Sequence, residues 1–207
     1  SGKHSVKFKT PGIFSLYNTL AAISASMILK MDIKKTLIAV SDMNSIEGRL
    51  EKIDTSKFAS PFCDVSVYID FAHTPDALEN ILKTARQFCR GRLILVFGCG
   101  GNRDRSKRPI MGRVASENAD MTIITSDNPR FEDPEKITSE IEEGFIGENK
   151  KIIVSRKEAI EYALSISKAG DVILLCGKGH EDYYIDKDGK HPFCERDVVL
   201  EYLESMS

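Results

Sequence analysis

Residues 121–134 read MTIITSDNPRFEDP, a short β-branched run followed at once by polar residues. The run 122–125 predicts a buried strand, because β-branched residues favour sheet interiors. Asp127, Asn128 and Arg130 then stand just beyond the carboxyl end of that strand, where ligands bind in open α/β sheets. This trio suits a small zwitterion, since the carboxylate accepts from an ammonium while the amide and guanidinium donate to a carboxylate. A turn leading into a helix N-cap explains the same residue types.

Strands and helices alternate on both sides of this stretch, from residue 65 onward. Apolar runs bounded by turn residues predict strands at Val65–Asp70, Leu93–Phe97, Met121–Thr125, Lys151–Val154 and Asp171–Cys176. Helical spacing predicts helices at Pro75–Phe88, Ile110–Asn118, Pro134–Phe145, Lys157–Ser167 and Arg196–Glu204. Five successive β–α units predict an α/β, Rossmann-like fold with a largely parallel, doubly wound sheet. Asp188-Gly189 predicts a hairpin over Tyr184–Phe193.

The N-terminal part of the chain has a different pattern. Apolar residues at helical spacing predict a helix with a close-packing face formed by Leu16, Leu20, Ile23 and Met27. A shorter helix is expected at Ile33–Val40, and an irregular stretch at Asp54–Asp64. We therefore predict two domains, residues 1–64 and 65–207.

The composition excludes several classes of protein. The 207 residues are 42% hydrophobic and 29% charged, and the net charge of −2 provides no global basic field for nucleic acid or an anionic membrane. No apolar run approaches the roughly 20 residues that span a bilayer, and no signal peptide is visible. An odd number of cysteines without C-x-x-C spacing favours reduced, mostly buried thiols in a cytoplasmic protein: Cys63, Cys89, Cys99, Cys176 and Cys194.

A glycine-rich, basic loop follows the predicted strand 93–97 and reads GCGGNRDRSKRP at residues 98–109. Glycines at a strand end let backbone N–H groups approach an anion, and the basic residues favour carboxylate or phosphate groups of a ligand. A dinucleotide-binding G-x-G-x-x-G would need glycine where Arg103 stands, so that fingerprint is absent. A solvated basic loop is the alternative interpretation.

Two further loops follow predicted strands. Residues 177–182 read GKGHED, and neither they nor any other stretch match the phosphate loop G-x-x-x-x-G-K-[ST]. Glu181 is suited to hold a ligand ammonium, whereas His180 is a candidate metal ligand or base that is more often structural beside a glycine turn. Asp70 is suited to accept from ribose hydroxyls. Because the carboxyl ends of parallel strands meet at one edge of the sheet, we expect these loops to converge.

Several blocks of sequence together resemble the Mur ligases, and within that family the MurE branch, which adds the third amino acid to the muramyl-dipeptide precursor of the bacterial cell wall. The blocks occur in the family's order and cover nearly the whole chain. They are GIFSLYN at 12–18 followed by Ala21-Ala22, GRLE at 48–51, DFAHTPDAL at 70–78, and the loops FGCGGNRDRSKRP, SDNPRFEDP and GKGHEDY.

The resemblance implies a cytoplasmic ligase of peptidoglycan biosynthesis, with a role in cell-wall biogenesis, cell shape and cell division. With ATP and Mg²⁺, such an enzyme converts the terminal carboxylate of UDP-MurNAc-L-Ala-D-Glu into an acyl phosphate, which the amino group of a diamino acid attacks. The implied diamino-acid pocket comprises Arg103, Asp127, Asn128, Arg130, Gly177 and Glu181. The implied ATP contacts are Asn18, Arg49, Asp70 and His73.

The same resemblance suggests which amino acid is added. Asp-Asn-Pro-Arg resembles the form that selects meso-diaminopimelate, and lysine-adding members typically lack the arginine. A guanidinium at Arg130 favours a side chain that ends in a carboxylate, and a charge-assisted hydrogen bond of this kind contributes about 1.5–3 kcal/mol.

The resemblance also places residue 1 partway through the family's central domain. We expect residues 1–64 to be the helical end of that ATP-binding domain and residues 65–207 to be the C-terminal amino-acid-binding (glutamate ligase) domain. The phosphate loop, the modified lysine, the main magnesium ligands and the UDP-binding domain would lie in an N-terminal remainder of the same enzyme. We therefore expect no catalytic residue and no metal ligand here, and no ligation by this chain alone.

Other interpretations remain open. The amino acid could be lanthionine or lysine, or the chain could belong to another Mur-like or folylpolyglutamate-type ligase, although the GKGHE loop weighs against the latter. The strand–glycine pattern also suggests a nicotinamide-dependent oxidoreductase, which the missing third glycine opposes. A non-catalytic Rossmann-like binding module is the remaining alternative.

Overall fold

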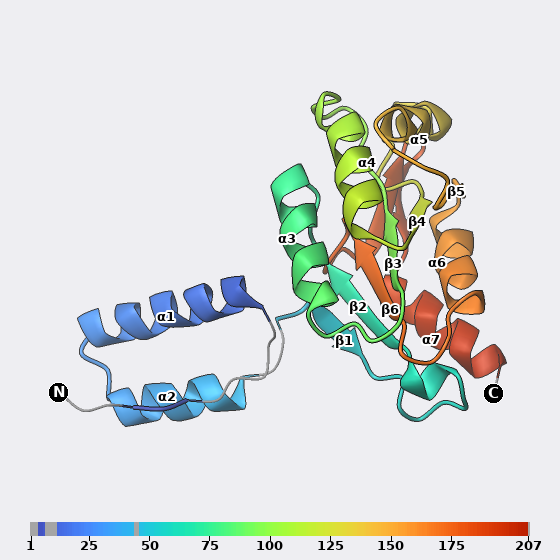
Figure 1. Ribbon diagram of the computed structural model, residues 1–207. Coiled ribbons are helices and arrows are strands. Elements are labelled where there is room, and N and C mark those ends of the chain that lie inside the picture. Colours follow the sequence, from blue (N-terminus) through green and yellow to red (C-terminus); the bar gives the residue numbers. More distant parts are fainter. Residues whose placement is uncertain (1–3, 7–11, 44–45, 207) are drawn as a thin grey trace. The chain divides into compact units, whose positions relative to one another are not determined.

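The computed structural model describes residues 4–6, 12–43 and 46–206. Contacts divide the chain into two compact units, Ser1–Ile46 and Glu47–Ser207. The larger unit carries the sheet and the loops on which the predicted pocket depends (Figure 1).

The first unit contains two helices, as predicted. Helix α1 covers Ile13–Ile28 and helix α2 covers Ile33–Asp42, with the Asp32 carboxylate accepting from the Lys35 amide at 3.0 Å. The expected packing face of α1 is largely open, since Leu20 is 48% and Met27 61% exposed. Within a two-helix unit, α1 has only α2 to pack against, so most of its apolar stripe has no covering partner among the described residues of this unit.

The second unit is built on a six-stranded sheet. In the order β1-β2-β6-β3-β4-β5, all neighbours are parallel except the antiparallel pair β1 and β2. The strands are β1 Glu51–Ile53, β2 Ser66–Asp70, β3 Leu93–Phe97, β4 Met121–Ile124, β5 Lys150–Ile152 and β6 Val172–Cys176. The predicted largely parallel α/β sheet is therefore confirmed.

Helices cover both faces of the sheet (Figure 1). Right-handed crossovers that advance from β2 towards β5 place α3 Pro75–Arg86, α4 Lys107–Asn118 and α5 Pro134–Glu142 on one face. The return from β5 to β6 places α6 Arg156–Ser165 on the other face, where it packs against α7 Glu195–Ser205. Ile94 and Val96 of β3 join the cluster beneath α6 and α7, while the alternate residues of the strand face the opposite side.

Helix starts follow the local sequence. Thr74 caps α3, Asp133 caps α5 and Ser155 caps α6, each by accepting from a backbone amide of the first turn. Proline follows directly in α3 and α5, where its missing N–H costs nothing. These caps end the short loop 71–73 that follows β2 and the longer loop 125–132 that follows β4.

The boundary between the compact units differs from the predicted one at residue 64. It lies between Ile46 and Glu47, because β1 pairs with β2 and so belongs to the sheet-containing unit. The strand β1 was not predicted, since Glu-Lys-Ile is too short and too charged to stand out from sequence. The predicted hairpin is present as β7 Tyr183–Asp186 and β8 Gly189–Pro192.

The helices and the cysteines were also compared with the expectations from sequence. None of the helices formed by residues 12–43 and 46–206 combines the length and apolar character that a bilayer crossing requires. The cysteines carry free thiols, as predicted. The prediction that most of them are buried is wrong, because only Cys99 and Cys176 are buried. Burial raises the pKa of the Cys99 thiol to about 12, so this group stays protonated.

Candidate functional site

Four loops leave the carboxyl ends of neighbouring strands. They follow β2, β6, β3 and β4, which lie side by side in that order, so the loops share one edge of the sheet. All the residues predicted to bind the diamino acid, together with His73, lie in these loops, and Asp70 is the last residue of β2. Arg49 precedes β1 in the same unit, whereas Asn18 is an exposed residue of α1 in the first unit.

The loops after β3 and β4 pack backbone against backbone. A Cβ on Gly98 would lie 2.2 Å from the Thr125 carbonyl oxygen, and one on Gly101 would lie 1.9 Å from the Pro129 carbonyl oxygen. The Gly101 amide also donates to the Asn128 carbonyl at 2.9 Å. These glycines therefore serve close packing between two loops, which differs from the anion approach that sequence reasoning assigned to them.

Asp127 and Gly177 lie together at the centre of the edge. Gly177 has a φ of 120°, and a Cβ there would be 3.2 Å from Asp127 Oδ2. Asp127 is only 7% exposed, and its Oδ1 has no hydrogen-bond partner, although Lys178 Nζ lies 3.5 Å away. A buried carboxylate oxygen with a spare acceptor position is a suitable receptor for a ligand ammonium.

The Asn128 amide is held from three directions. Its Oδ1 accepts from Lys178 Nζ and from the Ile185 amide, each at 3.0 Å. Its Nδ2 donates to Glu181 Oε2 at 2.8 Å, which joins the loops after β4 and β6. Sequence reasoning had this amide donating to a ligand carboxylate, whereas the structure pairs one of its N–H groups with a carboxylate of the protein.

The two predicted arginines flank Gly100. Arg130 adopts a φ of 54°, and its Nη1 donates to the Gly101 carbonyl at 2.9 Å and to the Asn128 carbonyl at 3.2 Å. A Cβ on Gly100 would lie 2.9 Å from Arg130 Nη1 and 3.8 Å from Arg103 Cγ. Arg103 is exposed and donates only locally, to the Asn102 carbonyl at 3.3 Å. Arg130 is thus anchored next to Asn128, while Arg103 lies on the rim.

Two buried arginines that sequence reasoning missed support these loops. Arg156 is 6% exposed, pairs with Glu195 at 2.7 Å and donates to the Cys176 carbonyl at 2.8 Å and the Ser126 carbonyl at 3.3 Å. Burial works to lower the pKa of Arg156, but Glu195 and Asp127 raise it overall, so the guanidinium stays charged. It therefore ties the ends of β4 and β6 together directly beneath Asp127 and Gly177.

The second of these arginines holds the glycine-rich loop. Arg108 is fully buried, and its guanidinium contacts Glu132 at 2.9 Å, Glu140 at 2.6 Å and the Gly100 carbonyl at 3.2 Å. Hydrogen bonding with Arg105 and with Arg108 lowers the pKa of Glu140 to about 2. The basic loop was interpreted as ligand-binding or solvated, but its Arg108 is buried and holds the loop against Glu132 and Glu140. We refer to this set of contacts as the Arg108 clamp.

A second cluster gathers on Phe71, after β2. The Arg49 guanidinium lies 4.8 Å from the ring centroid, and the rings of His73 and His180 lie 4.7 and 5.7 Å away. The side chains of Arg49, His73 and His180 are exposed around the half-buried Phe71 ring. This aromatic and cationic surface suits a base or phosphate of a nucleotide.

Asp70 has a largely internal role beside this cluster. Its Oδ2 accepts from the Leu50 amide at 2.7 Å and its Oδ1 from the Ala72 amide at 2.8 Å. Burial raises the pKa of Asp70 despite these bonds. Asp70 thereby fixes the GRLE turn against β2, and Gly48 of that turn lies so close to the 179–180 backbone that a Cβ would be 2.2 Å from the His180 amide nitrogen.

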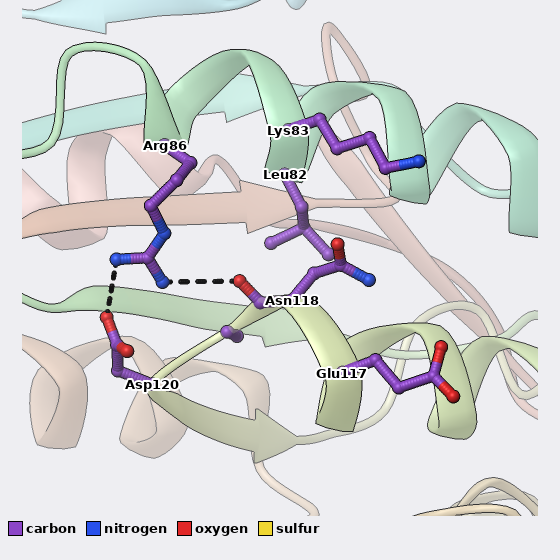
Figure 2. Close-up of a pocket in the computed structure, with 7 residues that line it drawn as sticks. Leu82, Lys83, Arg86, Glu117, Asn118 and Asp120 are labelled. Carbon is purple, nitrogen blue, oxygen red and sulfur yellow. Dashed lines mark hydrogen bonds and ion pairs between the residues drawn. The ribbon is translucent and has the colours of Figure 1, made fainter.

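A cavity of about 330 Å³ lies elsewhere, before β4 at the amino edge of the sheet (Figure 2). Arg86 crosses it and pairs with Asp120 at 2.8 Å and with the Asn118 carbonyl at 3.3 Å. None of the predicted site residues lines it. The arginine is satisfied by protein groups there, so this hollow does not compete with the carboxyl edge as a candidate site.

Comparison with known proteins agrees with the geometry. The family model for the Mur ligase, glutamate ligase domain, matches residues 48–179. The chain is 46% identical over 99% of its length to the UDP-N-acetylmuramoyl-L-alanyl-D-glutamate–2,6-diaminopimelate ligase of Clostridium botulinum, of which it covers 41%. It is likewise 46% identical over 95% of its length to the enzyme of that name from Clostridioides difficile, of which it covers 40%.

A solved structure of a ligase with the same name matches 99% of this chain and 41% of that chain, with a TM-score of 0.73 and 34% identity. The chain thus spans about two fifths of the length of the relatives it matches. Since the family model covers most of the chain and the parallel sheet carries the predicted loops at one edge, the chain belongs to the Mur ligase family.

Proposed function

We propose that this chain is the amino-acid-binding part of an ATP-dependent ligase that adds meso-diaminopimelate to UDP-MurNAc-L-Ala-D-Glu in peptidoglycan biosynthesis. The observation that carries the proposal is the linked group at the carboxyl edge. Carboxylates at Asp127 and Glu181 and guanidiniums at Arg130 and Arg103 are joined there through Asn128 and Gly100. Groups of both signs within one connected site suit a ligand that carries both charges.

The reaction divides into activation and attack. ATP phosphorylates the terminal carboxylate of the dipeptide substrate, and the amine of the incoming amino acid displaces phosphate from the acyl phosphate to form the amide. In this division the chain's own residues bind and orient the amine donor. Asp127 and Glu181 receive an ammonium of the amino acid, and Arg130 and Arg103 receive a carboxylate.

The guanidiniums also bear on the choice of amino acid. Lysine has no carboxylate at the end of its side chain, so it would leave a guanidinium without its anion, whereas meso-diaminopimelate supplies one. A site built to pair with a substrate group discriminates against an analogue that lacks it, because the charge-assisted hydrogen bond to that group is then lost. The names of the related ligases, which specify 2,6-diaminopimelate, support the same choice.

For the nucleotide we propose contacts with Arg49, Asp70 and His73, and with Asn18 of the first unit. The exposed cluster on Phe71 fits a nucleotide, and Asp70 contributes mainly by holding the turn that carries Arg49. Among residues 4–6, 12–43 and 46–206, no three His, Cys, Asp or Glu side chains gather as a metal site. Mg²⁺ would neutralise the phosphate charge of the bound nucleotide.

The test is the ligase that contains this chain, assayed for phosphate release with UDP-MurNAc-L-Ala-D-Glu and a panel of amine donors. We expect meso-diaminopimelate to be used, meso-lanthionine to be used less well, and L-lysine to be rejected. Preference for L-lysine would contradict the role of Arg130. Release of phosphate with none of these donors, but with glutamate and a folate acceptor, would favour the folylpolyglutamate-type alternative.

A further inference from the structure

The loop after β6 contains a lysine without a solvent-facing role. Lys178 is 0% exposed, although lysine is almost never fully buried unless it is paired. Its Nζ donates to Asn128 Oδ1 at 3.0 Å and to the Tyr183 carbonyl at 2.8 Å. Since a buried ammonium without partners would be strongly unfavourable, these contacts are what keep Lys178 in this place.

Lys178 also lies between the two carboxylates of the candidate pocket. Its Nζ is 3.5 Å from Asp127 Oδ1 and 3.8 Å from Glu181 Oε2. Burial lowers the pKa of Lys178, and Asp127 opposes that shift. The ammonium therefore acts as a shared counter-ion that allows two carboxylates to stand together before any ligand arrives.

The same ammonium determines how Asn128 is oriented. The Asn128 oxygen accepts from both Lys178 Nζ and the Ile185 amide, so a flipped amide would set its NH₂ group against two donors. With the oxygen held in this way, Nδ2 is directed at Glu181 Oε2, 2.8 Å away. Lys178 thus orients Glu181 through Asn128 as well as by direct attraction.

We propose that Lys178 is a positioning residue for the incoming amino acid, which presets Asp127, Asn128 and Glu181 without touching the ligand. This rests on the proposed function of the carboxyl edge. It separates two roles within the GKGHE loop: Glu181 meets the ligand, and Lys178, directed inward, sets the geometry of the groups that do.

The test is Lys178→Met in the ligase that contains this chain, because methionine keeps most of the length of the side chain and removes the charge and the donors. We expect the KM for meso-diaminopimelate to rise about 10- to 100-fold, since a buried acceptor and two carboxylates lose their partner. The KM for ATP should change by less than about twofold, because Lys178 Nζ donates to Asn128 and Tyr183, neither of which belongs to the Phe71 cluster. The matched control is Lys187→Met, an exposed lysine in the turn of the β7–β8 hairpin.

A double substitution tests whether Lys178 acts through Asn128. If it does, Asn128→Ala should add little to Lys178→Met, so the combined rise in KM should fall well below the product of the two single effects. Independent, multiplying effects would contradict the mechanism. If Lys178→Met does not fold, Lys178→Arg keeps the charge but displaces the donors, and it should raise the KM for the amino acid several-fold; an unchanged KM would overturn the inference.

The outcomes separate the inference from the proposed function. An unsubstituted enzyme that joins no diamino acid overturns both. An enzyme that joins meso-diaminopimelate and keeps its KM in Lys178→Met overturns the inference alone. A rise in the KM for ATP equal to that for the amino acid would reduce Lys178 to a general structural role.

Discussion

The two halves of the carboxyl edge differ in how much of the site exists before a ligand binds. On the proposed amino-acid side, Asp127, Asn128 and Lys178 are 7%, 4% and 0% exposed, and Lys178 contacts both of the others. On the proposed nucleotide side, Arg49 and His73 are exposed and contact Phe71. A preset pocket loses little side-chain entropy on binding, whereas an open cluster must still be ordered by its ligand. If the proposed function holds, selectivity for the amino acid lies in the buried half of the edge, which is ordered before the ligand binds.

The largest effect expected from this comparison is on stability. Arg156→Met removes one partner of the buried pair with Glu195 beneath the amino-acid side, and should lower the free energy of unfolding by about 3–5 kcal/mol. Urea unfolding of the chain measures this. The matched control is Arg113→Met, whose pair with Glu117 is exposed and should give no measurable change. Equal losses of unfolding free energy in the two variants would contradict the view that the buried pair beneath Asp127 stabilises this half of the edge.

The next effect is on the use of the amino acid. Arg130→Ala in the ligase that contains this chain should reduce kcat/KM for meso-diaminopimelate by roughly 10- to 150-fold, the equivalent of one charge-assisted hydrogen bond. The KM for ATP should remain as it is. Parallel losses for both substrates would mean that Arg130 does not belong to the amino-acid side alone.

A smaller effect is expected on the nucleotide side. Phe71→Leu removes the ring beneath Arg49, His73 and His180, and a cation–π contact at an exposed site contributes about 0.5–1 kcal/mol. The KM for ATP should therefore rise by a few-fold, while the KM for the amino acid stays constant. A larger change for the amino acid would show that the two halves are not separable.

The smallest effect concerns acid stability, because the pair between Glu140 and Arg105 is largely exposed and is screened by solvent. The pKa of Glu140 is lowered from 4.5 to about 2, so the stability it contributes is present above its unfolded pKa and is lost as pH falls through this window. Glu140→Gln should flatten the dependence of unfolding free energy on pH between these values. Chemical unfolding at a series of pH values measures the slope, and an unchanged slope would mean that the Arg108 clamp is not held by this charge.

Much of the fold was predictable because its signals are local. β-branched runs, capping residues and the Asp-Gly turn each depend on near neighbours, and they predicted the parallel strands, the helices and the hairpin. The strand β1 was not predicted, because three residues with two charges carry no periodic signal. Only their pairing with β2 defines them as a strand. For the same reason, the boundary between the compact units lies before β1, whereas the domain boundary was predicted at residue 64.

The candidate site also has features that were predictable from the sequence and features that were not. From sequence alone came the loops, the residue types at Asp127, Arg130 and Glu181, and the expectation that they converge, since parallel strands present their carboxyl ends together. The tertiary structure alone decided which charges face each other. Lys178 and Asn128 are 50 residues apart and Arg156 and Glu195 are 39 apart, and a buried ion pair leaves no trace in the local pattern of either partner. Electrostatic partners depend on distance in space, which only the folded chain defines.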